Sequence, residues 1–194
     1  MKALALLVAA LAGTAAAEPA FPKLYDVVGI DDALNLRDGP SSSAEEIGTL
    51  PPDTTGIEVL DVSENGYWMQ VALPEGSGWA AAGYLKPHPE DAGVLFATSM
   101  QCGGVEPFWS LDITQGDSAV FSRMESDDVT LPAGKIRKGT KQKGRYFLDL
   151  GDTHAALLVA EQCSDTMSDR PYGVSVNLVI DQSTILRGCC SLRP

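Results

Sequence analysis

The sequence predicts an all-β protein. Short apolar runs alternate with turn-forming residues along most of the chain, whose 194 residues include 19 glycines and 12 prolines. Such short, frequently broken runs are typical of strands joined by tight turns rather than of long helices. The hydrophobic content of 44% is that of a globular protein. All four cysteines lie in the second half, so we expect the two halves to be stabilised differently.

The first 17 residues have the features of a secretory signal peptide. Lys2 supplies a positive charge, residues 3–11 are apolar, and residues 14–17 are small. We expect cleavage after Ala17. The apolar run is shorter than the about 20 residues that span a bilayer. The expected product is therefore a periplasmic or secreted protein that does not span the membrane.

Composition divides the rest of the chain into two blocks. We expect one domain over residues 23–87, a linker over the proline-containing and acidic residues 88–93, and a second domain over residues 94–194. The first block has 11 acids and 3 bases, a net charge of −8, whereas the second has 12 acids and 10 bases, a net of −2. This acidity argues against a nucleic-acid partner, because nucleic acids select basic faces.

Strands are expected in both blocks. In the first block they cover residues 34–36, 57–62, 67–73 and 78–85, and in the second they cover 94–99, 108–114, 118–122, 145–149, 154–161 and 173–180. Residues 67–71 alternate, so Trp68 and Gln70 should point away from the side of Met69 and Val71. Strands this short, at this spacing, form a small barrel or sandwich.

The first block resembles the bacterial SH3 (SH3b) family. Residues 33–40, ALNLRDGP, resemble the opening "LNVRSGPS" of such domains, and residues 46–52 match the next strand and turn. Residues 66–71 are similar to the "GWxKV" strand, and residues 78–85 to the closing "GWV…YL" segment. The resemblance implies a small SH3-like barrel. It also implies a non-catalytic domain that binds peptidoglycan, its peptide stems or other peptides.

In such a barrel we expect the ligand near an aromatic and polar group of residues. The candidates are Asn35, Arg37, Tyr67, Trp68 and Trp79. Two alternatives compete with this view: Trp79 and Tyr84 serve only as core, and Arg37 pairs with Asp38 or Glu58. The block's negative charge favours an amine-bearing peptide or a basic protein over an acidic wall polymer, since like charges repel.

The second block resembles an exported bacterial family of unknown activity. Residues 102–111 are similar to its "CxGTEPFW" opening, residues 163–172 to its "CxDGMSDxxYP" signature, and residues 188–190 to its closing "GCC". The chain departs from this pattern at Val105, Thr166 and Gly173, where Thr, Gly and Pro are usual. The resemblance implies a β-rich envelope protein and supplies no reaction.

Several residues of these motifs are candidates for chemistry. The candidates are Glu106, Trp109, Asp165, Asp169 and Arg170. Paired carboxylates suit glycoside hydrolysis, with Glu106 acting together with Asp165 or Asp169, and carboxylate oxygens also suit calcium. The competing interpretation is that Asp165 and Asp169 cap turns and pair with Arg170. Phe108 and Trp109 are expected in the core.

The cysteines predict a disulfide framework. Four cysteines in an exported chain indicate disulfides rather than metal ligands, and the absence of a C-x2-C pair argues against zinc. A vicinal bond between Cys189 and Cys190 would be strained. We therefore expect Cys102 to pair with one of these two and Cys163 with the other. The alternative joins Cys102 to Cys163, and no metal or other cofactor is expected.

The remaining charged groups carry weaker signals. Six bases fall between Lys135 and Arg145, which predicts an exposed basic turn that either is simply solvated or contacts an envelope anion. His88 is expected to be solvated in the linker, and a catalytic role for His154 is disfavoured because no G-x-S-x-G elbow is present.

The function expected from these features is binding rather than catalysis. The SH3b-like domain would bind cell-wall peptide, peptidoglycan or a protein partner in the envelope. The alternatives are the glycan hydrolase described above and an inhibitor or structural protein that docks on another exported protein.

Overall fold

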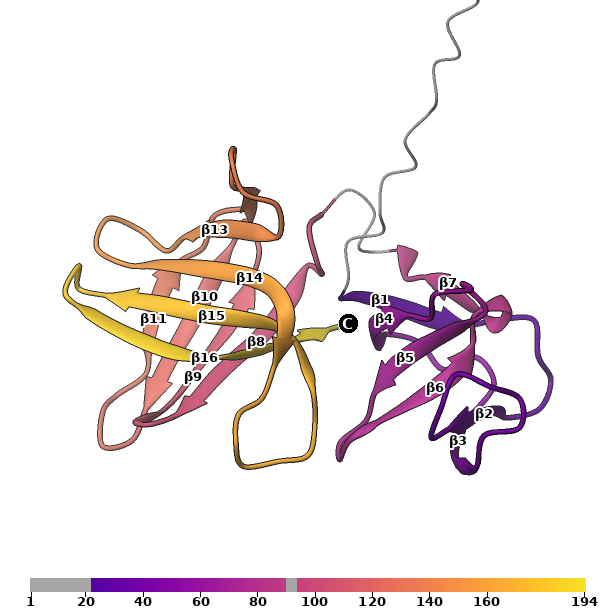
Figure 1. The fold of residues 1–194 in the computed structure, drawn as a ribbon. Helices are drawn as coiled ribbons and strands as arrows, with labels where there is room; N and C mark the ends of the chain where they lie inside the picture. The colour runs from indigo at the N-terminus through magenta and orange to yellow at the C-terminus, as the bar shows by residue number, and fades with distance from the viewer. Residues whose placement is uncertain (1–21, 90–93) are drawn as a thin grey trace, which may run out of the picture.

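The computed structural model describes residues 22–89 and 94–194, and these residues form two antiparallel sheets that lie side by side (Figure 1). The described residues contain strands and short 3-10 segments but no α-helix. The predicted all-β class is confirmed. The expected signal peptide, residues 1–17, lies outside the described residues, as do residues 90–93 of the expected linker.

The first sheet has seven strands in the order β3-β2-β6-β5-β4-β1-β7. They are β1 (Lys23–Val27), β2 (Leu34–Arg37), β3 (Glu46–Leu50), β4 (Ile57–Val62), β5 (Trp68–Ala72), β6 (Ser77–Ala81) and β7 (Leu85–Pro87), with the 3-10 helix η1 (Ala82–Tyr84) before β7. Buried and less buried residues alternate along its strand β2. Leu34 and Leu36 of this strand belong to one core cluster with Val59 and Val71. Met69 packs against the same core, so the predicted alternation of β5 is confirmed.

The second sheet has nine strands in the order β11-β10-β9-β8-β16-β15-β14-β13-β12. They are β8 (Ser99–Val105), β9 (Phe108–Thr114), β10 (Ser118–Arg123), β11 (Val129–Pro132), β12 (Arg137–Lys138), β13 (Arg145–Asp149), β14 (Ala155–Cys163), β15 (Tyr172–Ile180) and β16 (Thr184–Arg193). Strands β8 to β11 form one half of this sheet and strands β12 to β16 form the other, each in chain order. The two halves meet at one seam, where β8 pairs with β16. This seam brings the beginning and the end of the second half together.

The two disulfides reinforce this arrangement. Cys102 lies directly opposite Cys190 across the β8–β16 seam, and the two are bonded over a sequence separation of 88 residues. Cys163 is bonded to Cys189 and ties the loop between β14 and β15 to β16. Each vicinal cysteine therefore has a distant partner, as predicted. Closing such long loops stabilises a fold by about 2–4 kcal/mol per bond.

Glycines at the seam make room for Trp109, which is only 5% exposed. Gly104 lies opposite Trp109 in the β8–β9 pairing, and a Cβ there would collide with the indole Nε1 and with the Arg187 carbonyl oxygen. A Cβ at Gly188 would lie 2.8 Å from Cζ2 of the same indole. The glycines of the CGG and GCC motifs thus allow a large ring to fill the sheet's core.

Some expected elements are wrong. No strand covers residues 94–98, because the strand expected there begins only at Ser99, as β8. The structure also contains four strands that the sequence did not predict: β1, β11, β12 and β16. The sequence of β16 does not alternate clearly because it contains Gly188 and two adjacent cysteines. Glycine has a low strand propensity, and this glycine is required because a side chain there would collide with Trp109. Phe108, expected in the core, is 49% exposed.

Side chains from the first sheet help to build the core of the second. Leu24 of β1 is buried in the cluster of the second sheet, whereas its neighbour Tyr25 belongs to the core of the first. Adjacent residues of β1 therefore face different cores, which obscured its strand pattern. Close packing continues on both sides, because a Cβ at Gly173 would collide with Pro22 and one at Gly56 with the Pro194 ring.

A buried carboxylate crosses this interface. Glu58 of β4 is 5% exposed, and its Oε2 accepts a hydrogen bond from Arg170 Nη2 at 2.8 Å, while its Oε1 accepts one from the Leu192 N–H at 3.0 Å. Burial raises the pKa of Glu58 above its ordinary value, although the Leu192 N–H and the Arg170 guanidinium oppose the shift. Arg170 also donates to the Leu73 carbonyl oxygen of the first sheet. Arg170 and Leu192, from the second half of the chain, thus provide the hydrogen bonds that the buried Glu58 carboxylate of the first sheet requires.

The beginning of the expected linker is fixed to the first sheet. His88 Nδ1 lies 2.7 Å from Asp26 Oδ1, which also accepts a hydrogen bond from the Gly56 N–H. The expectation that His88 is solvated is therefore wrong. Within the part of the chain that is described, no helix is long and apolar enough to cross a membrane.

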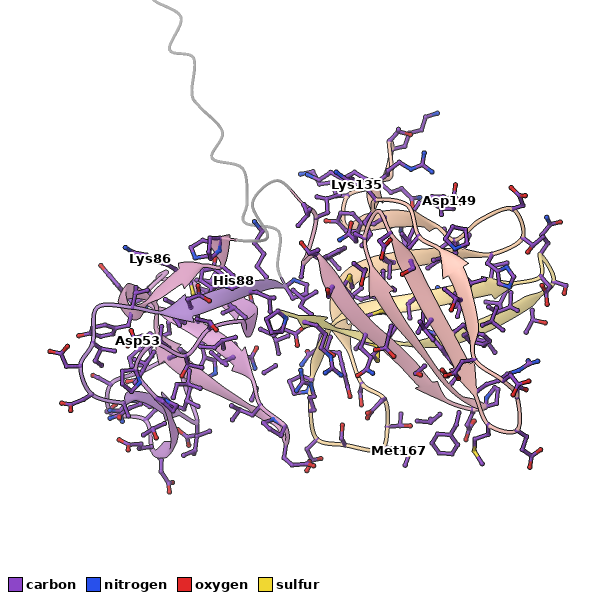
Figure 2. All side chains as sticks on the ribbon, turned by 180° about the vertical axis from the view of Figure 1, so that it is seen from behind. Asp53, Lys86, His88, Lys135, Asp149 and Met167 are labelled. Atoms are coloured by element: carbon purple, nitrogen blue, oxygen red, sulfur yellow. A yellow bond between two sulfur atoms is a disulfide. The ribbon has the colours of Figure 1, made fainter. Side chains whose placement is uncertain are left out.

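The two ends of the second sheet differ in character. Lys135 and Asp149 lie at one end, beside the basic turn that precedes β13, and Met167 lies at the opposite end, in the loop between β14 and β15 (Figure 2). Arg137 is 65% exposed and lies 3.9 Å from the Asp149 carboxylate. The predicted exposed basic turn is confirmed.

Replacing Gly104 by Ala should lower the free energy of unfolding by about 3 kcal/mol, because an added methyl group overpacks the site against Trp109 and backbone. Chemical denaturation of the oxidised protein measures this. Gly48→Ala is the control, because a Cβ at Gly48 meets no atom within 4 Å. Equal stability of the two variants would contradict the packing role of Gly104.

Replacing Glu58 by Ala should lower the free energy of unfolding by about 3–5 kcal/mol, because Arg170 and the Leu192 N–H lose a buried partner. Glu46→Ala, at an exposed position of β3, should change it by less than about 0.5 kcal/mol. The measurement is urea denaturation of both variants beside the wild type. A loss at Glu58 no larger than that at Glu46 would show that the interface bond is dispensable.

Candidate binding site

The outer side of the first sheet carries exposed aromatic residues. Trp68 and Trp79 are half-buried and lie outside the core, and Tyr67, in the turn before β5, is 73% exposed. Tyr84 is 40% exposed. The alternative that Trp79 and Tyr84 serve only as core is therefore wrong. Large apolar rings left at the surface of a small domain are typical of ligand contact.

Strand pairing places the predicted residues together. Trp79 of β6 lies opposite both Arg37 of β2 and Gln70 of β5, and Trp68 is a diagonal neighbour two residues further along β5. Asn35 lies on the same side of the sheet as Arg37, because side chains two residues apart in a strand point the same way. We call Asn35, Arg37, Trp68 and Trp79 the aromatic face, together with Tyr67, which precedes Trp68 in the chain and is 73% exposed. Gln70, which the sequence did not single out, lies on it as well.

Arg37 is oriented by backbone rather than by an acid. Its Nη1 donates a hydrogen bond to the Ala44 carbonyl oxygen at 2.8 Å, which links β2 to the loop before β3. The alternative that Arg37 pairs with Asp38 or Glu58 is wrong, since the guanidinium bonds Ala44 and the ion-pair partner of Glu58 is Arg170. Arg37 is half-buried and lies opposite Trp79 in the β2–β6 pairing.

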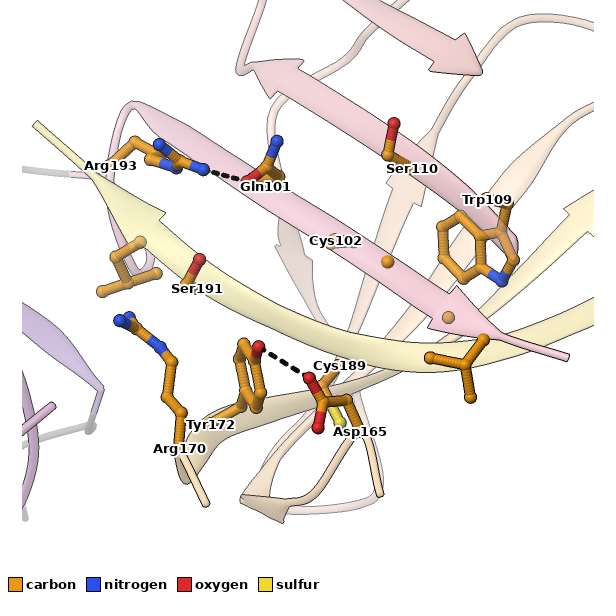
Figure 3. Close-up of a pocket in the computed structure, with 14 residues that line it drawn as sticks. Gln101, Cys102, Trp109, Ser110, Asp165, Arg170, Tyr172, Cys189, Ser191 and Arg193 are labelled. Atoms are coloured by element: carbon orange, nitrogen blue, oxygen red, sulfur yellow. Dashed lines mark hydrogen bonds between the residues drawn. The ribbon is translucent and has the colours of Figure 1, made fainter. Parts of the chain in front are cut away.

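A cavity of about 530 Å³ on the second sheet gathers three of the residues predicted there: Trp109, Asp165 and Arg170 (Figure 3). The cavity is also lined by Tyr172, at the start of β15, and by Arg193, at the end of β16. Tyr172 was missed as a site residue, although it ends the motif at residues 163–172. The loop held by Cys163 forms one side of the cavity, and β8 and β16 form its floor.

Asp165 organises the loop beside this cavity. Its Oδ1 accepts hydrogen bonds from the Met167 N–H at 3.0 Å and the Ser168 N–H at 2.9 Å, and its Oδ2 accepts one from the Tyr172 hydroxyl at 3.0 Å. Partial burial favours the neutral acid, but these bonds outweigh it and lower the pKa of Asp165 below its ordinary value. Asp165 therefore caps the turn, as one of the sequence interpretations expected. Thr166 within the turn has a φ of +64°, where the related pattern has glycine.

The carboxylates proposed for hydrolysis do not form an acid–base pair of the usual kind. Glu106 is exposed in the turn between β8 and β9 and lines a second cavity, of about 620 Å³, together with Asp165. Asp169 is exposed and lines neither of these cavities. A glycosidase acid needs a raised pKa, whereas that of Asp165 is lowered. The lowered pKa of Asp165 and the position of Asp169 outside both cavities argue against the hydrolase alternative.

Arg170 links the cavity to the first sheet. Its guanidinium bonds Glu58 rather than Asp165 or Asp169, so the expected local ion pair is wrong. The same guanidinium carbon lies 5.5 Å from the centre of the Tyr172 ring. Across the described residues, no group of three or more His, Cys, Asp or Glu side chains is arranged to hold a metal ion.

The aromatic face and the order of the strands around it can be compared with known families. Residues 32–86 match the family model of the bacterial SH3 domain. The match covers β2 to β6 and most of β7, so the SH3 domain includes the whole aromatic face. Strand β1 precedes the matched range, although it pairs with β4 and β7. No curated protein matches the chain.

Replacing Asp165 by Asn should lower the free energy of unfolding by about 1 kcal/mol at neutral pH, because charge-assisted hydrogen bonds are stronger than neutral ones. The lowered pKa of Asp165 means that the wild type holds this advantage above the ordinary pKa of 3.8 and loses it as the pH falls through the lowered value.

Urea denaturation at several pH values between neutral and strongly acid conditions tests this. Asp169→Asn, at an exposed position of the same loop, should show no comparable pH dependence. A difference between wild type and Asp165→Asn that grows as the pH falls would contradict the account.

Proposed function

We propose that the protein is an exported, non-enzymatic binding protein of the cell envelope whose SH3 domain binds cell-wall peptide through the aromatic face. The exposed aromatic rings of the matched SH3 domain carry this proposal. Bacterial SH3 domains are binding modules, and rings presented on rigid strands give contact area at low entropic cost. The two disulfides fit export to an oxidising compartment, as does the predicted signal peptide.

We expect the aromatic face to bind the stem peptide of peptidoglycan rather than its sugar strands. The net charge of −8 over residues 23–87, which contain the SH3 domain, opposes binding to an anionic polymer and favours a ligand that carries an amine. A protein partner with a basic segment would satisfy the same chemistry. Retention on purified sacculi distinguishes the two.

The test uses the chain from residue 18 onward rather than the SH3 domain alone, because isolating the domain would leave Glu58 without Arg170 and Leu192. The wild type should be retained on purified peptidoglycan sacculi at low salt. Tyr67→Ala and Trp79→Ala should each reduce retention about tenfold, since truncating a central aromatic contact costs about 1–2 kcal/mol or more.

Phe108→Ala is the matched control, because Phe108 is an exposed aromatic residue on the second sheet. It should be retained like the wild type. Failure of the wild type to bind sacculi would refute binding to the wall, and unchanged retention of both Tyr67→Ala and Trp79→Ala would refute the role of the aromatic face.

A further inference from the structure

The turn between β12 and β13 carries basic residues that the proposed function leaves unexplained. Residues 139–144 join the two strands, and this segment projects beyond β13 at one end of the second sheet (Figure 1). Six bases and no acid fall between Lys135 and Arg145, and all six bases are exposed. We call residues 135–145 the basic turn. Its charge contrasts with the net of −8 over residues 23–87.

The tip of the basic turn has an accessible backbone. Residues 140–143 are exposed, and in the part of the chain that the structure describes they take part in no hydrogen bond. Backbone bonds close the turn on either side of them: the Gly139 N–H donates to the Arg145 carbonyl oxygen, and the Ala160 N–H donates to the Gly144 carbonyl oxygen. A protease binds several substrate residues in extended form. The tip can adopt that form without first breaking a hydrogen bond.

The other basic residues are better protected. With four exceptions, every Lys and Arg in residues 22–89 and 94–194 lies within a strand. The exceptions are Lys135, Lys141, Lys143 and Arg170. The peptide bond after Lys135 is restrained, because the Ile136 N–H donates to Gln115 Oε1 at 2.9 Å. Arg170 is bonded to Glu58 across the interface. The remaining two lysines lie at the exposed tip of the basic turn.

A cut at this tip would leave two fragments joined by a disulfide. Cys102 precedes the basic turn and Cys190 follows it, and the two are bonded across the β8–β16 seam. The other disulfide lies wholly within the later fragment. Glu58 and its donor Arg170 also come from opposite sides of the cut, so the interface adds noncovalent contact between the fragments. Cleavage would thus open the turn and leave the order of the strands intact.

We infer that the basic turn is a proteolytic processing site, cut after Lys141 or Lys143 by an envelope protease that cleaves after basic residues. The processed protein is two disulfide-linked chains. The reaction consumes one water molecule: its hydroxyl joins the carbonyl carbon, the peptide C–N bond breaks, and its proton goes to the released nitrogen. Proteases of this class have an acidic specificity pocket, which the basic turn attracts and the acidic SH3 domain repels. The inference uses the exported location proposed above but not the binding of wall peptide.

Trypsin tests the site on the chain from residue 18 onward, purified with its disulfides intact. At a low ratio of trypsin to protein, the first cut should fall after Lys141 or Lys143. It should be about tenfold faster than any other, because peptide bonds within strands must first open. Mass spectrometry identifies the new ends. A denaturing gel should show one species without reductant and two fragments with it.

The double variant Lys141→Gln/Lys143→Gln should be cut about tenfold more slowly than the wild type. Lys86→Gln is the matched control, because Lys86 is an exposed base that lies within β7, and it should be cut like the wild type. A first cut within a strand, an unchanged rate in the double variant, or fragments that separate without reductant would overturn the inference.

Protein recovered from the envelope of the cells that produce it tests whether the site is used. After reduction it should contain a chain that begins at residue 142 or 144. Recovery of the uncut chain alone would overturn processing. Retention on sacculi is a separate readout, since it depends on the aromatic face and not on the basic turn. Loss of wall binding with the cut still present would refute only the proposed function.

Discussion

The buried carboxylate of Glu58 is the constraint on which the arrangement of the two sheets depends. Removing a carboxylate from water costs several kcal/mol unless its oxygens are bonded. The SH3 domain buries this group on β4, and the second half of the chain supplies two hydrogen-bond donors to it, the Arg170 guanidinium and the Leu192 N–H. Leu24 adds apolar contact beside it. The SH3 domain is therefore built to be completed by the rest of the chain.

A series of local constraints in the second sheet holds Arg170 in place. The Cys102–Cys190 bond closes the seam between the first and last strands, and the Cys163–Cys189 bond anchors the following loop to that seam. Asp165 then folds the loop by accepting two backbone N–H groups and the Tyr172 hydroxyl. Arg170 emerges from this loop toward the SH3 domain. The cysteine framework thus supports the interface.

Local patterns were enough to predict much of the fold. Alternation in β5, the turn signals and the SH3b motifs predicted the all-β class and the first barrel, and the strain of a vicinal bond predicted a distant partner for each of Cys189 and Cys190. The pattern failed where two sheets share residues. In β1, Leu24 and Tyr25 face different cores, and in β16, Gly188 is required by Trp109 rather than by strand propensity.

The candidate site was predictable only in part, for the same reason. The aromatic face follows from residues close in sequence or matched to known motifs, so Trp68 and Trp79 were found. The partner of Glu58 lies 112 residues away in Arg170, and no local pattern reports such a distance.

The most direct test of this account is ¹⁵N relaxation of the chain from residue 18 onward, which measures how each sheet tumbles in solution. Amides of β5 in the SH3 domain and of β15 in the second sheet should report one common rotational correlation time, that of a single particle. Two separate, shorter correlation times would mean that the sheets move independently, and would contradict the Glu58 interface.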